Sequence, residues 1–159
     1  MALRRLPHLM HAHNRVRLAV VLLLLAGVLA LILTSCPSNR DGMPGKLASA
    51  KEETESAARM GAQALDLWIK RRSTGNLTAV QLSDARDQIA KAYSGIAVLR
   101  AEDPQDLRRQ SLLTETMTTL IGQLNTANAV VRAVDGQPDA RQLRQSMLDA
   151  VDRLTATYR

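Results

Sequence analysis

Apolar residues recur every three or four positions along four stretches that follow residue 45, and polar residues fill the positions between them, as in amphipathic helices. The stretches predict helices at about residues 46–73, 78–101, 104–135 and 139–158. No stretch alternates with the two-residue period of a strand. Because the breaks between the predicted helices are short, neighbouring helices should run antiparallel. The pattern therefore predicts an all-α protein with an antiparallel four-helix bundle at residues 46–159, and an elongated coiled coil of two chains is the alternative.

The apolar stripes define a predicted core made mainly of aliphatic side chains. Its members are Leu47, Ala57, Gly61, Ala64, Leu65 and Trp68, then Leu82, Ala85, Ile89, Tyr93, Ile96 and Leu99, then Leu107, Leu113, Met117, Leu120, Ile121, Leu124 and Val131, and finally Leu143, Met147, Val151, Leu154 and Tyr158. We also interpret Met60 as core filler, together with Met117 and Met147, rather than as a ligand of a soft metal or a haem.

Polar residues mark where each helix should begin. Ser49 and Thr78 are each followed three residues later by a glutamate or glutamine, which is the spacing of a capping box. Asp103 stands before Pro104, a residue that fits the first position of a helix. Asp139 is the predicted cap of the last helix.

Four glycines and one asparagine interrupt the helical pattern. Gly75 is predicted to end the first helix in a left-handed conformation. Gly61, Gly95 and Gly122 fall inside predicted helices, where glycine costs about 1 kcal/mol relative to alanine. Such a position indicates close helix packing, a ligand groove or tolerated instability, and the alanines around Gly61 favour packing. Asn128 lies on or beside a buried stripe, where it can fix the helix register, contact a ligand or face water.

The N-terminal segment has the layout of an export signal. Residues 18–33 contain no charged or strongly polar group, and the arginines Arg4, Arg5, Arg15 and Arg17 precede them without any acidic residue. A helix of 16 residues spans about 24 Å, which is less than the thickness of a bilayer core at about 30 Å. Arginines on this side favour an N-terminus in the cytoplasm and a body outside it.

Leu33, Thr34, Ser35 and Cys36 resemble the lipobox of bacterial lipoproteins, in which an aliphatic residue and two small residues precede a cysteine. The resemblance implies that the thiol of Cys36 receives a diacylglycerol and that residues 1–35 are removed as a signal peptide. It covers residues 1–36 only and names no family for the body. An uncleaved single-pass anchor and a cleaved, freely secreted protein are the alternatives. Residues 36–45, rich in proline and glycine, are predicted to form a flexible tether.

The charge of the body is nearly balanced. The whole chain carries a net charge of +6, and residues 1–35 supply most of it. Beyond them the basic runs are Lys70, Arg71 and Arg72, together with Arg108 and Arg109, which we take as a candidate interaction surface. Aromatic residues are not interleaved with these runs, so we expect no nucleic-acid binding.

The residue types that most catalytic and metal sites need are absent from the body. All three histidines, His8, His11 and His13, precede the apolar segment, and Cys36 is the only cysteine. This excludes His-dependent and Cys-dependent nucleophilic triads and His/Cys zinc sites from the helical part. We expect no metal, no cofactor and no enzymatic activity.

The sequence therefore predicts a lipoprotein that is anchored on the extracytoplasmic side of the cell membrane through a lipid on Cys36. Its helical body would act as an interaction module for another protein of the bacterial envelope. Two alternatives remain open: a binding protein for a lipid or small apolar ligand held between helices, and an exclusion or immunity lipoprotein of a phage or plasmid.

Overall fold

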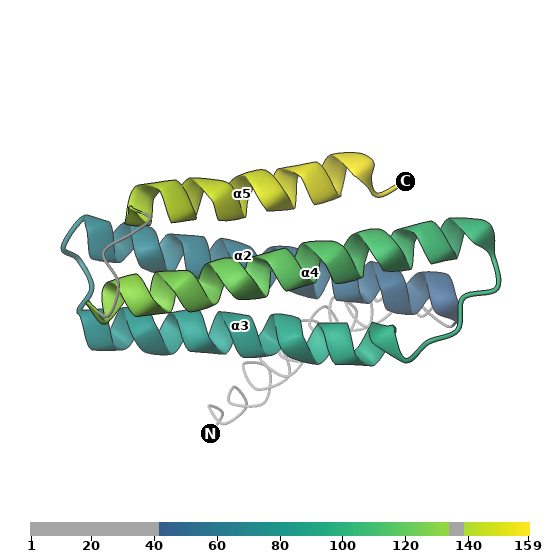
Figure 1. Ribbon diagram of the computed structural model, residues 1–159, viewed down its shortest axis with the longest axis horizontal. Helices are drawn as coiled ribbons and strands as arrows, with labels where there is room; N and C mark the ends of the chain where they lie inside the picture. The colour runs from purple at the N-terminus through teal and green to yellow at the C-terminus, as the bar shows by residue number, and fades with distance from the viewer. Residues whose placement is uncertain (1–41, 134–138) are drawn as a thin grey trace, which may run out of the picture. The chain divides into compact units, whose positions relative to one another are not determined.

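The computed structural model describes residues 42–133 and 139–159, which form four helices and, in these ranges, no strand (Figure 1). They are α2 (Met43–Ile69), α3 (Gly75–Ala97), α4 (Pro104–Val131) and α5 (Ala140–Thr157). Successive helices run in opposite directions. The predicted all-α antiparallel four-helix bundle is confirmed. None of these four helices combines the length and the apolar character that a membrane span requires.

The four helices are not equivalent in their packing. Each of α2 and α4 contacts the other three helices, whereas α3 and α5 do not contact each other. Figure 1 accordingly shows α3 and α5 on opposite sides of α2 and α4. The buried face of α2 explains this arrangement, because small side chains let helix axes approach each other closely. Its small buried residues are Gly45, Ala50, Ala57, Ala58, Gly61, Ala62 and Ala64.

Large aliphatic side chains from all four helices fill the space between the axes. Those with almost no exposed surface are Leu47, Leu65, Leu82, Ile89, Leu113, Met117, Leu120, Leu124, Met147, Val151 and Leu154. Two predicted core residues are wrong: Leu107 is 49% exposed and Met60 is 45% exposed. Asp106, seven residues before Leu113, occupies the core-facing position at the start of α4, so the adjacent Leu107 points away from the core.

Two helices begin where local chemistry predicted. The side chain of Asp103 accepts hydrogen bonds from the backbone N–H groups of Gln105 at 2.7 Å and Asp106 at 3.3 Å, and Pro104 is the first residue of α4. Asp139 stands at the N-cap of α5, although its side chain makes no capping hydrogen bond. The predicted end of the third helix near residue 135 lies outside the described residues, and α4 ends at Val131.

The predicted starts of the other two helices are wrong. Helix α2 begins at Met43 rather than Ser49, so residues 43–45 belong to the helix and not to the predicted tether. A proline is tolerated at Pro44 because the first turn needs no N–H there. Helix α3 begins at Gly75, with Thr74 as its cap, so Thr78 lies inside the helix instead of before it.

The stop of α2 also differs from the prediction. Gly75 does not end this helix; Arg71 takes the left-handed conformation instead, with φ of 55°. Gly75 packs against the end of α4, where a Cβ on this residue would lie 3.4 Å from the carbonyl oxygen of Val131. Helix α3 ends at Ala97, four residues before the predicted end at residue 101, and Gln110 donates hydrogen bonds to the carbonyls of Ile96 and Leu99.

Asn128 belongs to the packing of α4 on α3. Its side-chain amide is partly buried and donates to the carbonyl oxygen of Ala79 and to the hydroxyl of Ser83, both at 2.9 Å. Each bond requires a particular register between the two helices, because the acceptors are one turn apart on α3. The Asn128 amide therefore helps to fix the register of α4 against α3.

Candidate functional site

The residues predicted to process and anchor the chain, Leu33, Thr34, Ser35 and Cys36, lie outside the described residues. The helical body supplies the surfaces that the structure can test. Within residues 42–133 and 139–159, no three His, Cys, Asp or Glu side chains come together as a metal ion would require.

The two basic runs of the predicted interaction surface lie at opposite ends of the bundle. Lys70, Arg71 and Arg72 form the turn between α2 and α3, whereas Arg108 and Arg109 lie on the second turn of α4. Figure 1 shows these two regions at the two ends of the long axis. The 27 residues of α2 span about 40 Å at 1.5 Å per residue, so a single compact partner site cannot contain both runs. The predicted surface is thus two separate surfaces.

Arg109 is a structural residue of the bundle. Its Nε donates to the main-chain oxygen of Arg159 at 3.0 Å, and its Nη1 donates to Asp106 Oδ1 at 3.4 Å. The guanidinium also lies over the ring of Tyr158, 5.5 Å from the centroid, and the ammonium of Lys51 lies 5.6 Å from the same centroid. These contacts join the start of α4 to the residues that follow α5. Arg108, in contrast, is exposed.

Burial and charge act in opposite directions on Tyr158. Burial raises the pKa of the Tyr158 hydroxyl and Asp106 adds to this, while Arg109 lowers it, and the net pKa lies above its usual value of 10.0. The phenol thus remains neutral over the ordinary range of pH, and its ring is a cation–π partner of Lys51 and Arg109.

The basic turn between α2 and α3 is a Schellman motif with an arginine in the position that glycine usually takes. The N–H of Arg71 donates to the carbonyl of Trp68 at 2.9 Å, and the N–H of Arg72 donates to that of Leu67 at 2.8 Å. A left-handed conformation costs an L-residue about 1–2 kcal/mol. Arg71 and Arg72 are exposed. Beside Arg71, the residues Trp68, Ile69 and Ser73 line a concavity of about 360 Å³.

Lys70 differs from its two neighbours because it is paired. Its ammonium lies 2.7 Å from Asp66 Oδ2, and Arg144 of α5 approaches the other oxygen of this carboxylate at 3.4 Å. The hydrogen bond from Lys70, followed by the charges of Lys70 and Arg144, holds the pKa of Asp66 below its usual value of 3.8 against a smaller opposing effect of burial. The carboxylate of Asp66 is therefore already paired with two cations.

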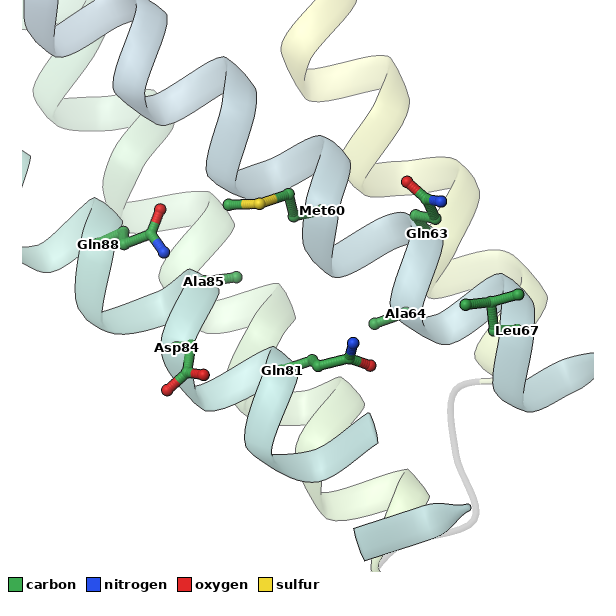
Figure 2. A pocket seen from close by; sticks show the side chains of 8 residues that line it. All are labelled: Met60, Gln63, Ala64, Leu67, Gln81, Asp84, Ala85 and Gln88. Carbon is green, nitrogen blue, oxygen red and sulfur yellow. The ribbon is translucent and has the colours of Figure 1, made fainter. Parts of the chain in front are cut away.

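A second concavity, of about 320 Å³, lies between α2 and α3 (Figure 2), and we call it the α2–α3 groove. Its lining residues are Met60, Gln63, Ala64 and Leu67 from α2, and Gln81, Asp84, Ala85 and Gln88 from α3. The two buried alanines form the floor. Figure 2 shows Met60 extended toward Gln88, and Gln81 extended toward Ala64. Sequence reasoning missed this groove because it placed Met60 in the core.

The side chains that line the groove are mostly neutral. Three amides offer hydrogen-bond donors and acceptors, and the thioether of Met60 offers a polarisable apolar contact. Asp84 is the only ionisable residue in the lining. The groove therefore offers mainly neutral hydrogen-bonding groups and apolar contacts to a partner.

An ion pair and a hydrogen bond link α5 to α2. Glu55 accepts from the hydroxyl of Thr155 at 2.6 Å and lies 2.8 Å from Lys51, and Arg59 lies 3.5 Å from Asp152. Burial raises the pKa of Glu55, but the hydrogen bonds from Lys51 and Thr155 and the charges of Lys51 and Arg59 together outweigh it. The pKa of Glu55 therefore lies below its usual value of 4.5.

These lowered pKa values predict that acid destabilises the bundle. A carboxylate whose pKa is lower in the folded than in the unfolded chain contributes stability that is complete above the unfolded value and is lost as the pH falls through the folded value. For Glu55 the loss begins near pH 4.5 and for Asp66 near pH 3.8. Urea unfolding of the full chain in a mild non-ionic detergent, followed by circular dichroism between pH 6 and pH 3, measures it. The Glu55→Gln variant should depend less on pH, and an unchanged dependence would contradict this role of Glu55.

The bundle also brings together charges that are far apart in the sequence. Arg132 follows the end of α4 and Arg141 lies in the first turn of α5, so both lie at the same end of the bundle as Arg71 and Arg72. Sequence reasoning missed these two arginines because they stand singly. The antiparallel topology was the available signal, since it places the α2–α3 turn and the α4–α5 connection at one end.

Comparison with protein-family models, with curated proteins and with solved structures finds no match for this chain.

Proposed function

We propose that this chain is a lipid-anchored interaction module of the bacterial envelope, with the lipid on Cys36 and a protein partner in the α2–α3 groove. The resemblance of residues 33–36 to a lipobox supports the anchor. The exposure of Met60 within a groove supports the partner site, because methionine is a flexible and polarisable side chain that recurs at adaptable binding surfaces. This exposed methionine is the observation that carries the proposal.

Further apolar surface continues the groove along α3. Leu77 lies one helical turn before Gln81, and Val80 lies one turn before Asp84, so both extend the face that lines the groove. Leu77 is 53% exposed and Val80 is 55% exposed. Apolar side chains that gather on one face mark an interaction site more often than scattered ones do. The inward-facing apolar residues of the four helices pack against one another in the core.

The ligand-carrier alternative would need a space that encloses most of a ligand. The α2–α3 groove is open to solvent along one side, and alanines close its floor. A lipid or small molecule that remains bound through purification would replace the interaction-module proposal.

The anchor is tested by intact mass spectrometry of protein extracted from the membrane. We expect a mature chain that begins at Cys36 and carries added acyl mass. The Cys36→Ala variant should retain residues 1–35 and gain no acyl mass. A wild-type chain that keeps residues 1–35, or that lacks acyl mass on Cys36, would contradict the anchor.

The partner site is tested by a photo-crosslinking residue placed at Gln88, which lines the groove, and at Gln142, an exposed glutamine on α5 that serves as the matched control. In native membranes a protein adduct should form from position 88 and not from position 142. The same adduct should disappear when Met60→Glu is added. An adduct that forms equally from both positions, or that survives Met60→Glu, would show that the groove is not the partner site.

A further inference from the structure

Four arginines from three different segments lie at one end of the bundle. Arg71 and Arg72 come from the α2–α3 turn, Arg132 from the end of α4, and Arg141 from the first turn of α5. Contact between the segments holds them together, because Gly75 after the turn packs on the backbone of Val131, next to Arg132. We call these four residues the basic end face.

Among residues 42–133 and 139–159, no carboxylate is paired with the basic end face. All four arginines are exposed, and no acidic side chain among the described residues forms an ion pair with any of them. The nearest acid on α2, Asp66, is already engaged by Lys70 and Arg144. Asp139, the N-cap of α5, is the one described carboxylate left at this end. The dipoles of the helices contribute little, because two N-termini and two C-termini meet there.

One of the four arginines occupies a position that costs stability. Arg71 has the left-handed conformation that a glycine would adopt without strain, and its side chain borders the concavity that Trp68, Ile69 and Ser73 line. The left-handed conformation itself serves to end α2, as Ala133 with φ of 57° does after α4. What Arg71 adds is an exposed guanidinium beside a concavity with a hydroxyl and an indole, where a ligand has access to it.

The type and number of the charges point to the chemistry of the ligand. Guanidinium groups bind phosphate oxygens in a bidentate manner, and four arginines carried by three segments suit a ligand with several phosphates better than one small anion. Nucleic acid is a weaker fit, because Trp68 is the only tryptophan, is half-buried, and has no second ring beside it on which bases could stack. The ligand that fits is a phosphate-bearing polymer without bases.

The position of the face in the chain separates this ligand from the headgroups around the anchor. The chain enters the bundle at Met43, and the basic end face lies at the other end of α2, about 40 Å away. Here the argument rests on the proposed function, since it takes Cys36 as the point of attachment. We propose that the basic end face binds a phosphate-rich polyanion beyond the membrane surface to which the chain is attached.

Trp68 allows the binding to be measured without a label, because it is the only tryptophan of the chain and borders the face. The full chain in a neutral detergent is titrated with short inorganic polyphosphate while tryptophan emission is recorded. We expect a saturable change in emission that weakens as salt is raised. Arg71→Gln together with Arg72→Gln should weaken the affinity about 25-fold, at about fivefold per exposed cation.

The matched control removes the same charge elsewhere. Arg108→Gln together with Arg153→Gln changes two exposed arginines that lie outside the basic end face, so the affinity should change less than about twofold. An equal loss in both double variants would show attraction by net charge alone and would overturn the site. Nanodiscs with anionic headgroups and a single-stranded oligonucleotide complete the comparison. Tighter binding of either one than of polyphosphate, or no saturable change with any of the three, would also overturn the proposal.

The single variant Arg71→Gly separates binding from folding. Glycine relieves the left-handed strain, so the midpoint of thermal unfolding should rise by a few degrees while the affinity for polyphosphate falls about fivefold. A purely structural arginine would not show these opposite changes. The Cys36→Ala variant should bind polyphosphate as the wild type does, so failure of the lipid anchor and failure of this site can be told apart.

Discussion

Replacing Gly61 by valine should lower the free energy of unfolding by about 3 kcal/mol, because inserting volume into a packed core strains its neighbours. A Cβ on Gly61 would lie 2.6 Å from Leu124 Cδ2 and 3.5 Å from the Cβ of Ala85. Leu124 is 1% exposed, so its side chain has little room to retreat. The contact lies where α2 approaches α4, and valine would push these two helices apart. Urea unfolding of the full chain in a mild detergent, followed by circular dichroism, measures the change.

Gly122→Val is the matched control for this substitution. A Cβ on Gly122 would meet nothing within 4 Å, so valine should be tolerated and should raise stability slightly, by less than about 0.5 kcal/mol through helix propensity. Gly95 has the same open surroundings, and Gly95→Ala should be stabilising as well. If Gly61→Val and Gly122→Val had the same effect, packing would not be the reason for Gly61.

A double-mutant cycle identifies the side chain responsible. Leu124→Ala alone should cost about 2–5 kcal/mol, as expected for a buried leucine. Combined with Gly61→Val it should cost less than the two single changes together, by about 1–3 kcal/mol, because the new side chain enters the space that Leu124 leaves. Additive costs would contradict a direct contact between positions 61 and 124.

Reversing the charge of Arg109 should be the second large perturbation. Arg109→Glu removes the partner of Asp106, which is 6% exposed, and places a second negative charge beside it. It also removes the cation over the ring of Tyr158 and the donor to the main-chain oxygen of Arg159. We expect a loss of about 2–3 kcal/mol in the free energy of unfolding, since an unpaired and mostly buried carboxylate is costly even where part of it reaches water.

Arg108→Glu provides the same change of charge on the preceding residue. Arg108 is exposed, so its reversal should alter stability by no more than about 0.5 kcal/mol. Unfolding of the two variants under identical conditions gives the comparison. Equal stabilities would mean that the contacts of Arg109 contribute nothing. A loss of partner binding in Arg109→Glu cannot by itself be assigned to an interface, whereas a loss in Arg108→Glu can.

Features encoded within a few residues were predictable from the sequence. The start of α4 is one, because the Asp103 side chain and Pro104 satisfy the first turn without help from any other element. The helical class is another, because the α-helix is the regular backbone structure that places apolar residues three or four positions apart on one buried face. The pattern was less reliable in predicting which residues of a helix face the core. At the start of α4 it favoured Leu107, but Asp106 takes the core-facing position.

Helix boundaries that depend on a distant contact were not predictable. Both Thr74 and Thr78 can cap a helix, but Gly75 fits against Val131 only when α3 starts after Thr74, and Thr78 then donates its hydroxyl hydrogen to Ser73. The early start of α2 has a similar origin. Leu47 is fully buried in the core, and α2 begins one turn before it, at Met43.

The sequence by itself determined the number of helices, their antiparallel order and most of the residues that they bury, because these depend on local hydrogen bonding and on apolar periodicity. Only the tertiary structure decided which residues share a surface. It placed Gly61 against Leu124 and Arg109 over the ring of Tyr158. It also brought Arg132 and Arg141 to the same end of the bundle as the α2–α3 turn. The physical reason is that such contacts join positions many turns apart, and their geometry follows from how closely the helix axes approach, which no single stretch of the chain encodes.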